Sequence, residues 1–127
     1  MSMGMISRYL ERLAARVRPR RAVPPAVSAD GEGLRIGGDR MAWLAVRRVE
    51  AFKRDVYVGD CLCLALLDSN GRVFEIDEAS PGWAQAGDAI ERHMPGSVPR
   101  TEWMLRLLAA DPGQSVAIHP PTRGGVD

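Results

Sequence analysis

The most restrictive feature of the sequence is the segment 60–68, in which seven apolar residues, CLCLALL, stand between two aspartates. A run this short is typical of a strand buried on both faces, which places it in the centre of a sheet. Ser-Asn-Gly follows at 69–71 and is a strong hairpin signal, because Asn-Gly suits a type I′ turn. Within residues 72–78, Phe74 and Ile76 then alternate with Glu75 and Asp77. The sequence therefore predicts an antiparallel hairpin with a buried first strand.

The pattern on either side of this hairpin predicts an α+β fold. Gly37 and Gly38 follow a short alternating segment and supply the positive φ values that a reversal needs. Ser80-Pro81 has the form of a helix N-cap followed by a first helical proline, and Thr101 is a second expected cap. The expected elements are a strand at 33–36, a helical turn at 43–46, a strand at 47–54, helices at 82–94 and 102–110, and a last short strand at 114–119. We expect an antiparallel sheet of four or five strands packed against the two C-terminal helices.

An N-terminal segment of different composition precedes this domain. Residues 5–18 predict a basic amphipathic helix, and a stretch rich in proline, arginine and glycine follows that is typical of an extended linker, up to residue 31. We expect the helix to dock on its own domain or to remain unordered. A partner protein, a membrane surface contacted through residues 5–21, and nucleic acid are less favoured alternatives. The folded domain is expected at 32–119, with a flexible tail at 120–127. The basic patch of the N-terminal segment consists of Arg8, Arg12, Arg16, Arg20 and Arg21.

The net charge of +1 conceals an uneven distribution. The chain has 17 basic and 16 acidic residues, but residues 1–31 hold six arginines against Glu11 and Asp30, so this part carries +4 and the rest −3. Residues 55–78 have six acidic side chains against Arg72 alone, a local charge of −5. A nearly neutral total gives no argument for nucleic acid, whereas an acidic strand surface suits a protein partner with a basic surface. A single lysine among 17 basic residues is typical of a GC-rich bacterial genome.

The residues expected to contact such a partner are acidic side chains of the strands and two tryptophans. Each tryptophan of the chain falls on the apolar face of a predicted helical turn, where packing in the core is expected, but one or more could rim a peptide groove. The candidate contact residues are Glu75, Asp77, Glu78, Asp60, Trp43 and Trp83.

The two cysteines, Cys61 and Cys63, lie in the apolar run. Residues two apart on a strand share a face but are poorly placed for a disulfide, so buried free thiols are expected. A metal site would need further ligands, and His93 and His119 stand outside any recognised zinc spacing. Reduced cysteines and the absence of a secretory signal favour a cytoplasmic location.

The sequence predicts no catalytic residue, metal or cofactor. His93 lies at a predicted helix end, where contact with the last carbonyls is the usual role of a histidine. Asp68 begins a segment with a superficial likeness to a calcium loop, but Arg72, Val73 and Ala79 occupy the positions of the required ligand, glycine and glutamate. No glycine-rich loop has the context that phosphate binding requires.

A loose pattern of hydrophobic positions, tryptophans and turns extends over residues 32–103. It comprises GLRI at 33–36, Trp43, Val46 and Val49 followed by FKRD at 52–55, DCLCLALL at 60–67 with its Asn-Gly turn, VFEIDE at 73–78, PGW ending at Trp83, and Glu102-Trp103. In this pattern the chain resembles a group of small uncharacterised bacterial proteins whose sheet of hairpins is similar to that of pleckstrin-homology-like domains. The resemblance implies a partial barrel and an adaptor or ligand-binding role. The basic phosphoinositide-binding cluster of such domains is replaced here by acidic residues.

The function favoured by the sequence is that of a small non-enzymatic interaction module, adaptor-like or similar to a toxin-neutralising immunity protein, that uses its acidic strand surface. A second hypothesis is an enzyme in which His93 meets Glu75, Asp77 or Asp88 in a deep pocket. A third is a module held at an acidic membrane by residues 5–21.

Overall fold

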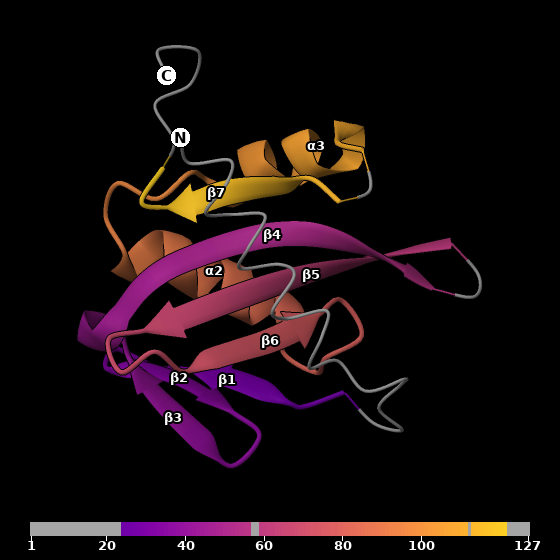
Figure 1. Ribbon diagram of the computed structural model, residues 1–127. Helices are drawn as coiled ribbons and strands as arrows, with labels where there is room; N and C mark the ends of the chain where they lie inside the picture. The colour runs from indigo at the N-terminus through magenta and orange to yellow at the C-terminus, as the bar shows by residue number, and fades with distance from the viewer. Residues whose placement is uncertain (1–23, 57–58, 112, 122–127) are drawn as a thin grey trace.

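A four-stranded antiparallel sheet forms the centre of the structure, a computed structural model that describes residues 24–56, 59–111 and 113–121 (Figure 1). The predicted hairpin is present in it, and the first strand of the hairpin lies inside the sheet with a neighbour on each edge. Residues 62–66 of that strand are buried. The strands of this sheet are β4 (Val46–Val56), β5 (Gly59–Asp68), β6 (Val73–Asp77) and β7 (Ser115–His119). Their order across the sheet is β6-β5-β4-β7.

The strands that precede this sheet form a separate three-stranded antiparallel sheet. It contains β1 (Val27–Ala29), β2 (Gly33–Ile36) and β3 (Asp39–Ala42), and the 3-10 helix η1 (Trp43–Ala45) connects β3 to β4. The α+β class is confirmed, but the strands are divided between two sheets, not gathered in one sheet of four or five. β1 falls within the segment expected to be linker and pairs with β2, so the folded part begins before residue 32.

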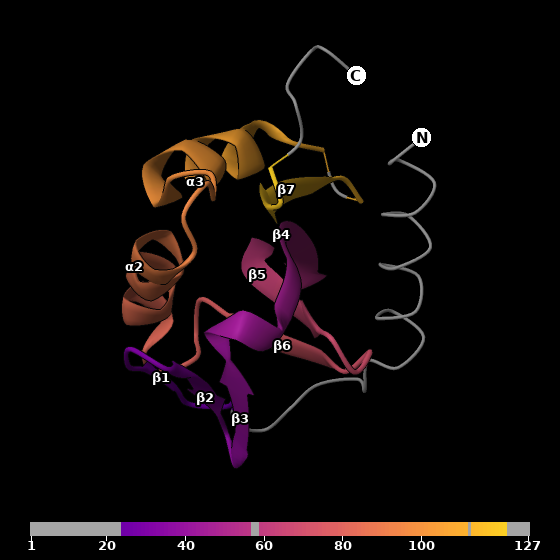
Figure 2. The same ribbon diagram turned by 90° about the vertical axis from the view of Figure 1, so that its left-hand side faces the viewer.

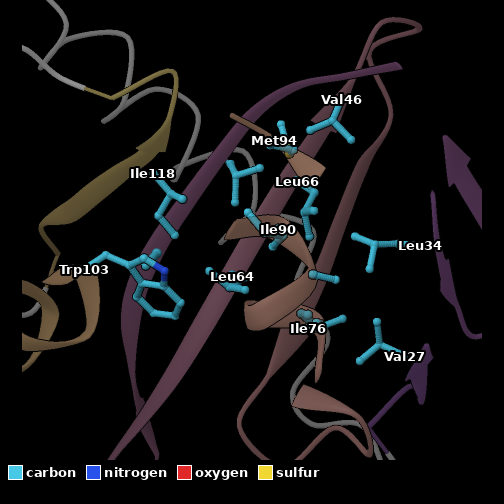
Figure 3. Packing of buried hydrophobic residues seen from close by; sticks show 14 of the residues in the cluster. Val27, Leu34, Val46, Leu64, Leu66, Ile76, Ile90, Met94, Trp103 and Ile118 are labelled. Carbon is cyan, nitrogen blue, oxygen red and sulfur yellow. The ribbon is translucent and has the colours of Figure 1, made fainter. Parts of the chain in front are cut away.

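Both helices lie on one side of the four-stranded sheet, and the three-stranded sheet packs on that same side (Figure 2). The helices are α2 (Trp83–His93) and α3 (Arg100–Ala109). Figure 3 shows the core between these layers, where Trp103 of α3 lies near Ile118 and Leu64, and Ile90 of α2 lies near Leu66. Leu34 approaches from the three-stranded sheet. Each such buried side chain stabilises the fold by about 1.5–3 kcal/mol relative to exposure.

The turn between β5 and β6 differs from the predicted type I′ turn. A type I′ turn needs positive φ at both central residues, but in the described part of the chain only glycines have positive φ, and Gly71 has 84°. Gly71 N donates to Asp68 O, and Asp68 N donates to Arg72 O, both at 3.0 Å. This is a three-residue loop with glycine at the left-handed position. The carboxylate of Asp68 favours it by accepting bonds from the amides of Asn70 (2.9 Å) and Arg72 (2.8 Å).

The helix starts also differ from the predicted caps. α2 follows Gly82, which has a left-handed φ of 91° and makes no side-chain cap. Ser80 instead accepts a hydrogen bond of 3.1 Å from the amide of Asp77, so its hydroxyl completes the preceding turn. α3 has Pro99 as its N-cap and begins at Arg100, before the expected cap Thr101.

Several expectations concern residues that the structure does not describe. The N-terminal basic helix and its patch (Arg8, Arg12, Arg16, Arg20 and Arg21) lie outside the described residues, as does most of the tail at 120–127. Within the described ranges, neither helix combines the length and the apolar character needed to cross a membrane.

Candidate interaction site

An open hollow of about 520 Å³ lies at the end of the domain where α2 finishes. It forms where η1, the β1–β2 turn and the last residue of α2 meet, so its shape depends on the packing of α2 against the three-stranded sheet. We call it the Trp43 hollow, and its lining residues are Gly31, Glu32, Arg40, Ala42, Trp43, Leu44 and His93.

Trp43 is the buried member of the hollow and is held on two sides. Its indole stacks on the imidazole of His93, with ring centroids 5.2 Å apart and 26° between the ring planes. Its Nε1 donates a hydrogen bond of 2.8 Å to the carbonyl oxygen of Asp30. A tryptophan whose N–H is already bonded inside the fold is a rigid surface, and little conformational entropy is lost when a ligand packs on it.

Asp30 organises the acidic edge of the hollow. Its Oδ1 accepts hydrogen bonds from the backbone amides of Glu32 (2.8 Å) and Gly33 (3.0 Å), and these bonds lower the pKa of Asp30, with a smaller contribution from the charge of Arg40. Arg40 also donates to the carboxylate of Glu32 at 3.2 Å. The Glu32 side chain remains 87% exposed, so it has room for a further donor.

Leu44 is the exposed apolar member of the hollow. It is 94% exposed, although it stands between the buried Trp43 and the half-buried Ala45. The turn that presents it is fixed, because Ser69 N donates a 2.8 Å bond to Ala45 O and so ties η1 to the β5–β6 hairpin. Sequence reasoning missed Leu44, since a leucine beside a tryptophan is expected to be buried with it. The sequence signal for the exposure of Leu44 was the three-residue spacing from Trp43 to Val46, because in a 3-10 turn this spacing places Leu44 on another side from these two residues.

The second predicted tryptophan, Trp83, lies far from the hollow. It is the first residue of α2 and His93 is the last, so the two ends of this helix are about 15 Å apart. Trp83 is half-buried and packs edge-on against Trp103, with ring centroids 6.3 Å apart and 89° between the planes. The structure therefore does not bring Trp43 and Trp83 together at one groove.

Two of the predicted acidic residues, Asp77 and Glu78, lie at and just after the end of β6 that is opposite the β5–β6 turn, to which η1 is bonded. Asp77 accepts a bond of 2.8 Å from the amide of Ala79, and Glu78 accepts one of 3.0 Å from the amide of Leu62. These bonds attach the end of the β5–β6 hairpin to the loop that leads into α2. The two carboxylates thus have structural roles as well as charge.

The other two predicted acidic residues differ in how far the structure describes them. Glu75 forms an ion pair with Arg54 across the four-stranded sheet, so part of its charge is balanced within the fold. Asp60 lies in β5 opposite Asp55, and the side chain of Asp60 falls outside the described part. Of the predicted acidic side chains that the structure describes (Glu75, Asp77 and Glu78), none lines the Trp43 hollow, where Glu32 is the acidic group.

The second hypothesis expected His93 to meet Glu75, Asp77 or Asp88 in a deep pocket, but the structure gives His93 a different partner. His93 stacks on Trp43, while Asp88 is bonded at 3.0 Å to Arg100 and Glu75 is paired with Arg54.

The thiols and the second histidine are placed in or near the four-stranded sheet. Cys61 and Cys63 are free, the first partly and the second fully buried, and burial raises the pKa of both. The Nδ1 of His119 lies 3.3 Å from the hydroxyl of Ser97, and burial lowers the pKa of His119. Among the residues that the structure describes, no three histidine, cysteine or acidic side chains are grouped so as to hold a metal ion.

Comparisons with known proteins add no relative: no protein-family model matches the chain, and no match is found among the curated proteins or the solved structures.

Proposed function

We propose that this protein is a small, non-enzymatic, cytoplasmic interaction module that binds a partner protein through the Trp43 hollow. The observation that carries the proposal is the exposure of Leu44 on a fixed turn beside the Trp43–His93 stack. When a partner covers a leucine that its own fold leaves in water, the burial stabilises the complex, by about 2 kcal/mol if the side chain is fully covered. Aromatic and apolar anchors of this kind dominate the energy of protein interfaces.

The chemistry of the hollow indicates what the partner presents. An apolar side chain of the partner packs against Leu44 and the edge of the Trp43–His93 stack. A basic side chain beside it meets Glu32, whose carboxylate is largely exposed although it accepts a bond from Arg40. This agrees with the basic partner surface expected from the charge of the sequence. The negative charge of Asp77 and Glu78 adds long-range attraction for such a partner without contacting it.

A photo-crosslinking experiment in the native host tests this role. Leu44 is replaced by p-benzoylphenylalanine in one protein and Leu105, an exposed leucine of α3, in a matched control. We expect position 44 to form an adduct with one heterologous protein and position 105 to form none with it. Identical adducts at both positions, or none at position 44, would contradict the proposal.

The affinity of the partner identified in this way gives the first quantitative prediction. Leu44→Asp is expected to raise the Kd of the isolated pair at least thirty-fold, which corresponds to the roughly 2 kcal/mol of lost burial. Leu105→Asp should leave the Kd within two-fold of the wild-type value. Because Leu44 makes little contact within its own fold, its replacement should change the free energy of unfolding by less than about 0.5 kcal/mol. Titration calorimetry and urea unfolding measure the two effects separately.

A further inference from the structure

The four-stranded sheet has a second face, turned away from the helices, which we call the outer face. Strand alternation and the pairing register assign its members. They are Arg48, Glu50, Phe52 and Arg54 of β4, Cys61, Cys63, Ala65 and Leu67 of β5, Val73, Glu75 and Asp77 of β6, and Ser115 and Ala117 of β7. The middle of this face holds the apolar cluster of Phe52, Cys63 and Ala65 with the carboxylate of Glu50 beside it.

The middle of the outer face is withdrawn from water. Phe52 is 8% exposed, and Cys63, Ala65 and Glu50 are 0% exposed. In the described part of the chain, the apolar cluster on this face is made only of residues from β4, β5 and β6, while both helices and the three-stranded sheet pack on the opposite face (Figure 2). Neighbours within one sheet cannot cover a phenylalanine ring from above. The burial of these residues therefore requires a further layer of chain over the outer face.

Polar atoms on the same face need hydrogen-bond donors from that layer. Glu50 Oε2 is bonded to Arg48 at 3.1 Å, and Glu75 is paired with Arg54 through Oε1. The second oxygens of these carboxylates, Glu50 Oε1 and Glu75 Oε2, are buried and have no hydrogen-bond partner among the described residues. The same is true of the hydroxyl of Ser115. A buried carboxylate oxygen without a donor is costly, so the covering layer should carry guanidinium or amide donors.

The N-terminal segment of the chain has both properties. Residues 1–23 contain six arginines and one glutamate, and the apolar positions of 5–18 recur at helical spacing. Arg16 follows Tyr9 by seven residues, so on a helix it lies about 20° from Tyr9 and borders the apolar stripe. The stripe consists of Ile6, Tyr9, Leu10, Leu13 and Val17.

The dimensions also agree. A helix over 5–18 is about 21 Å long, shorter than the roughly 33 Å of a ten-residue strand such as β5. The described chain begins at Pro24, and the next residue, Pro25, lies near Gly37 in the turn between β2 and β3. The six steps of chain between Arg18 and Pro24 can reach about 20 Å, and four strands are about 14 Å across. The segment can therefore reach the outer face of its own sheet.

We propose that residues 5–18 form a helix that packs its apolar stripe on the outer face of the four-stranded sheet of the same chain, with arginine donating to Glu50 and Glu75. This contact joins the basic N-terminal part to the acidic body of the chain. With this helix in place, the four-stranded sheet is the middle of three layers, between the N-terminal helix and the layer formed by the two C-terminal helices and the three-stranded sheet.

Photo-crosslinking of the full-length chain tests the contact and identifies its occupant. Tyr9 is replaced by p-benzoylphenylalanine, which keeps an aromatic ring in the stripe, and equal amounts of ¹⁴N- and ¹⁵N-labelled protein are mixed before irradiation. We expect adducts that join the Tyr9 peptide to β4 or β5 peptides of the same isotope. The matched control carries the photoreactive residue at Arg8, about 100° around the helix, and should give no such adduct. Adducts of mixed isotope would show that a second copy of the chain covers the face. If no adduct of either kind formed, the face would be assigned to another partner. Either result overturns the proposal.

Thiol accessibility provides an independent measurement. Cys63 lies in the middle of the outer face, so removal of the covering helix should expose it. Leu13→Asp in the full chain is expected to raise the rate of Cys63 modification by a disulfide reagent at least ten-fold. Leu108→Asp, on the exposed side of α3, is the matched control and should change it less than two-fold. An unchanged rate in Leu13→Asp would contradict the docking.

A folding control accompanies the thiol measurement. The three tryptophans all pack in or against the core on the helix side of the sheet, so an unchanged tryptophan emission spectrum shows that this core is intact while the outer face has opened. If Leu13→Asp unfolds the whole chain, the crosslinks from Tyr9, made in an otherwise wild-type stripe, still decide the question.

Discussion

The carboxylate of Asp68 determines the local structure of the β5–β6 turn. It is buried, and it accepts bonds from two backbone amides and from Nε of Arg72 at 2.8 Å. Replacing Asp68 by alanine leaves these donors without their acceptor. We expect Asp68→Ala to lower the free energy of unfolding by about 2 kcal/mol. Urea unfolding measures this, with Asp39→Ala, at the exposed first residue of β3, as a control that should stay within about 0.5 kcal/mol.

The same residue predicts how stability depends on pH. Burial alone would raise the pKa of Asp68, but the bonds from the Arg72 guanidinium and from the backbone amides outweigh it and lower the pKa below its usual range. A carboxyl group whose pKa is lower in the folded chain stabilises the fold above its unfolded pKa, and this contribution is lost as the pH falls through the folded pKa. The free energy of unfolding should therefore decrease below about pH 4. Asp68→Asn should show a shallower decrease over the same series, and parallel curves for the two proteins would contradict this account.

At the scale of the elements, the junction between β1 and the start of α2 depends on Gly82. Its φ is 91°, and a Cβ at this position would overlap the carbonyl oxygen of Val27. Val27 N is also bonded at 2.8 Å to Pro81 O, so the two segments cannot separate without losing that bond. Gly82→Ala is expected to lower the free energy of unfolding by about 3 kcal/mol.

Gly96 supplies the matched control for that substitution. It has a similar φ of 88°, but an added Cβ there meets open space. Gly96→Ala should therefore cost only the backbone strain, about 1–2 kcal/mol. Thermal and urea unfolding of the two variants compare them, and equal losses would show that the contact with Val27 does not matter.

The elements that could be predicted from the sequence are those determined by local patterns. The apolar run at 60–68 and the alternation after it predicted β5 and β6, because burial on both faces leaves few other arrangements. The turn type was wrong because the bonds of the Asp68 carboxylate compete with the preference of Asn70-Gly71. β1 was missed because three residues within a proline-rich stretch carry no periodicity.

The candidate site shows the same limit. Trp43 was predicted in a helical turn, but its stacking on His93 joins residues fifty positions apart, which no local pattern reports. The division of the strands into two sheets, and the bonds from Asp77 and Glu78 to backbone amides, likewise depend on the assembled fold.

At the scale of the whole molecule, the two sheets should differ in their protection against hydrogen exchange. The amides of β5 are bonded on both sides within the larger sheet, whereas β1–β2–β3 is a small sheet attached to the rest through side chains and few backbone bonds. We expect β5 to exchange only through global unfolding and the three-stranded sheet to exchange at least ten-fold faster through partial opening. Exchange monitored by mass spectrometry tests this, and equal protection of the two sheets would mean that they open as one unit.

The position of β7 in the larger sheet has a consequence for synthesis on the ribosome. β7 pairs with the edge of β4 at residues 49–52, yet it follows the end of β4 by about sixty residues. At a translation rate of about 5–20 residues per second, that edge waits for roughly 3–12 seconds before its partner strand is made. During this interval the nascent chain presents a free strand edge to its neighbours. A product terminated after α3 would keep that edge permanently and should aggregate, even though every helix and the central hairpin have already been made.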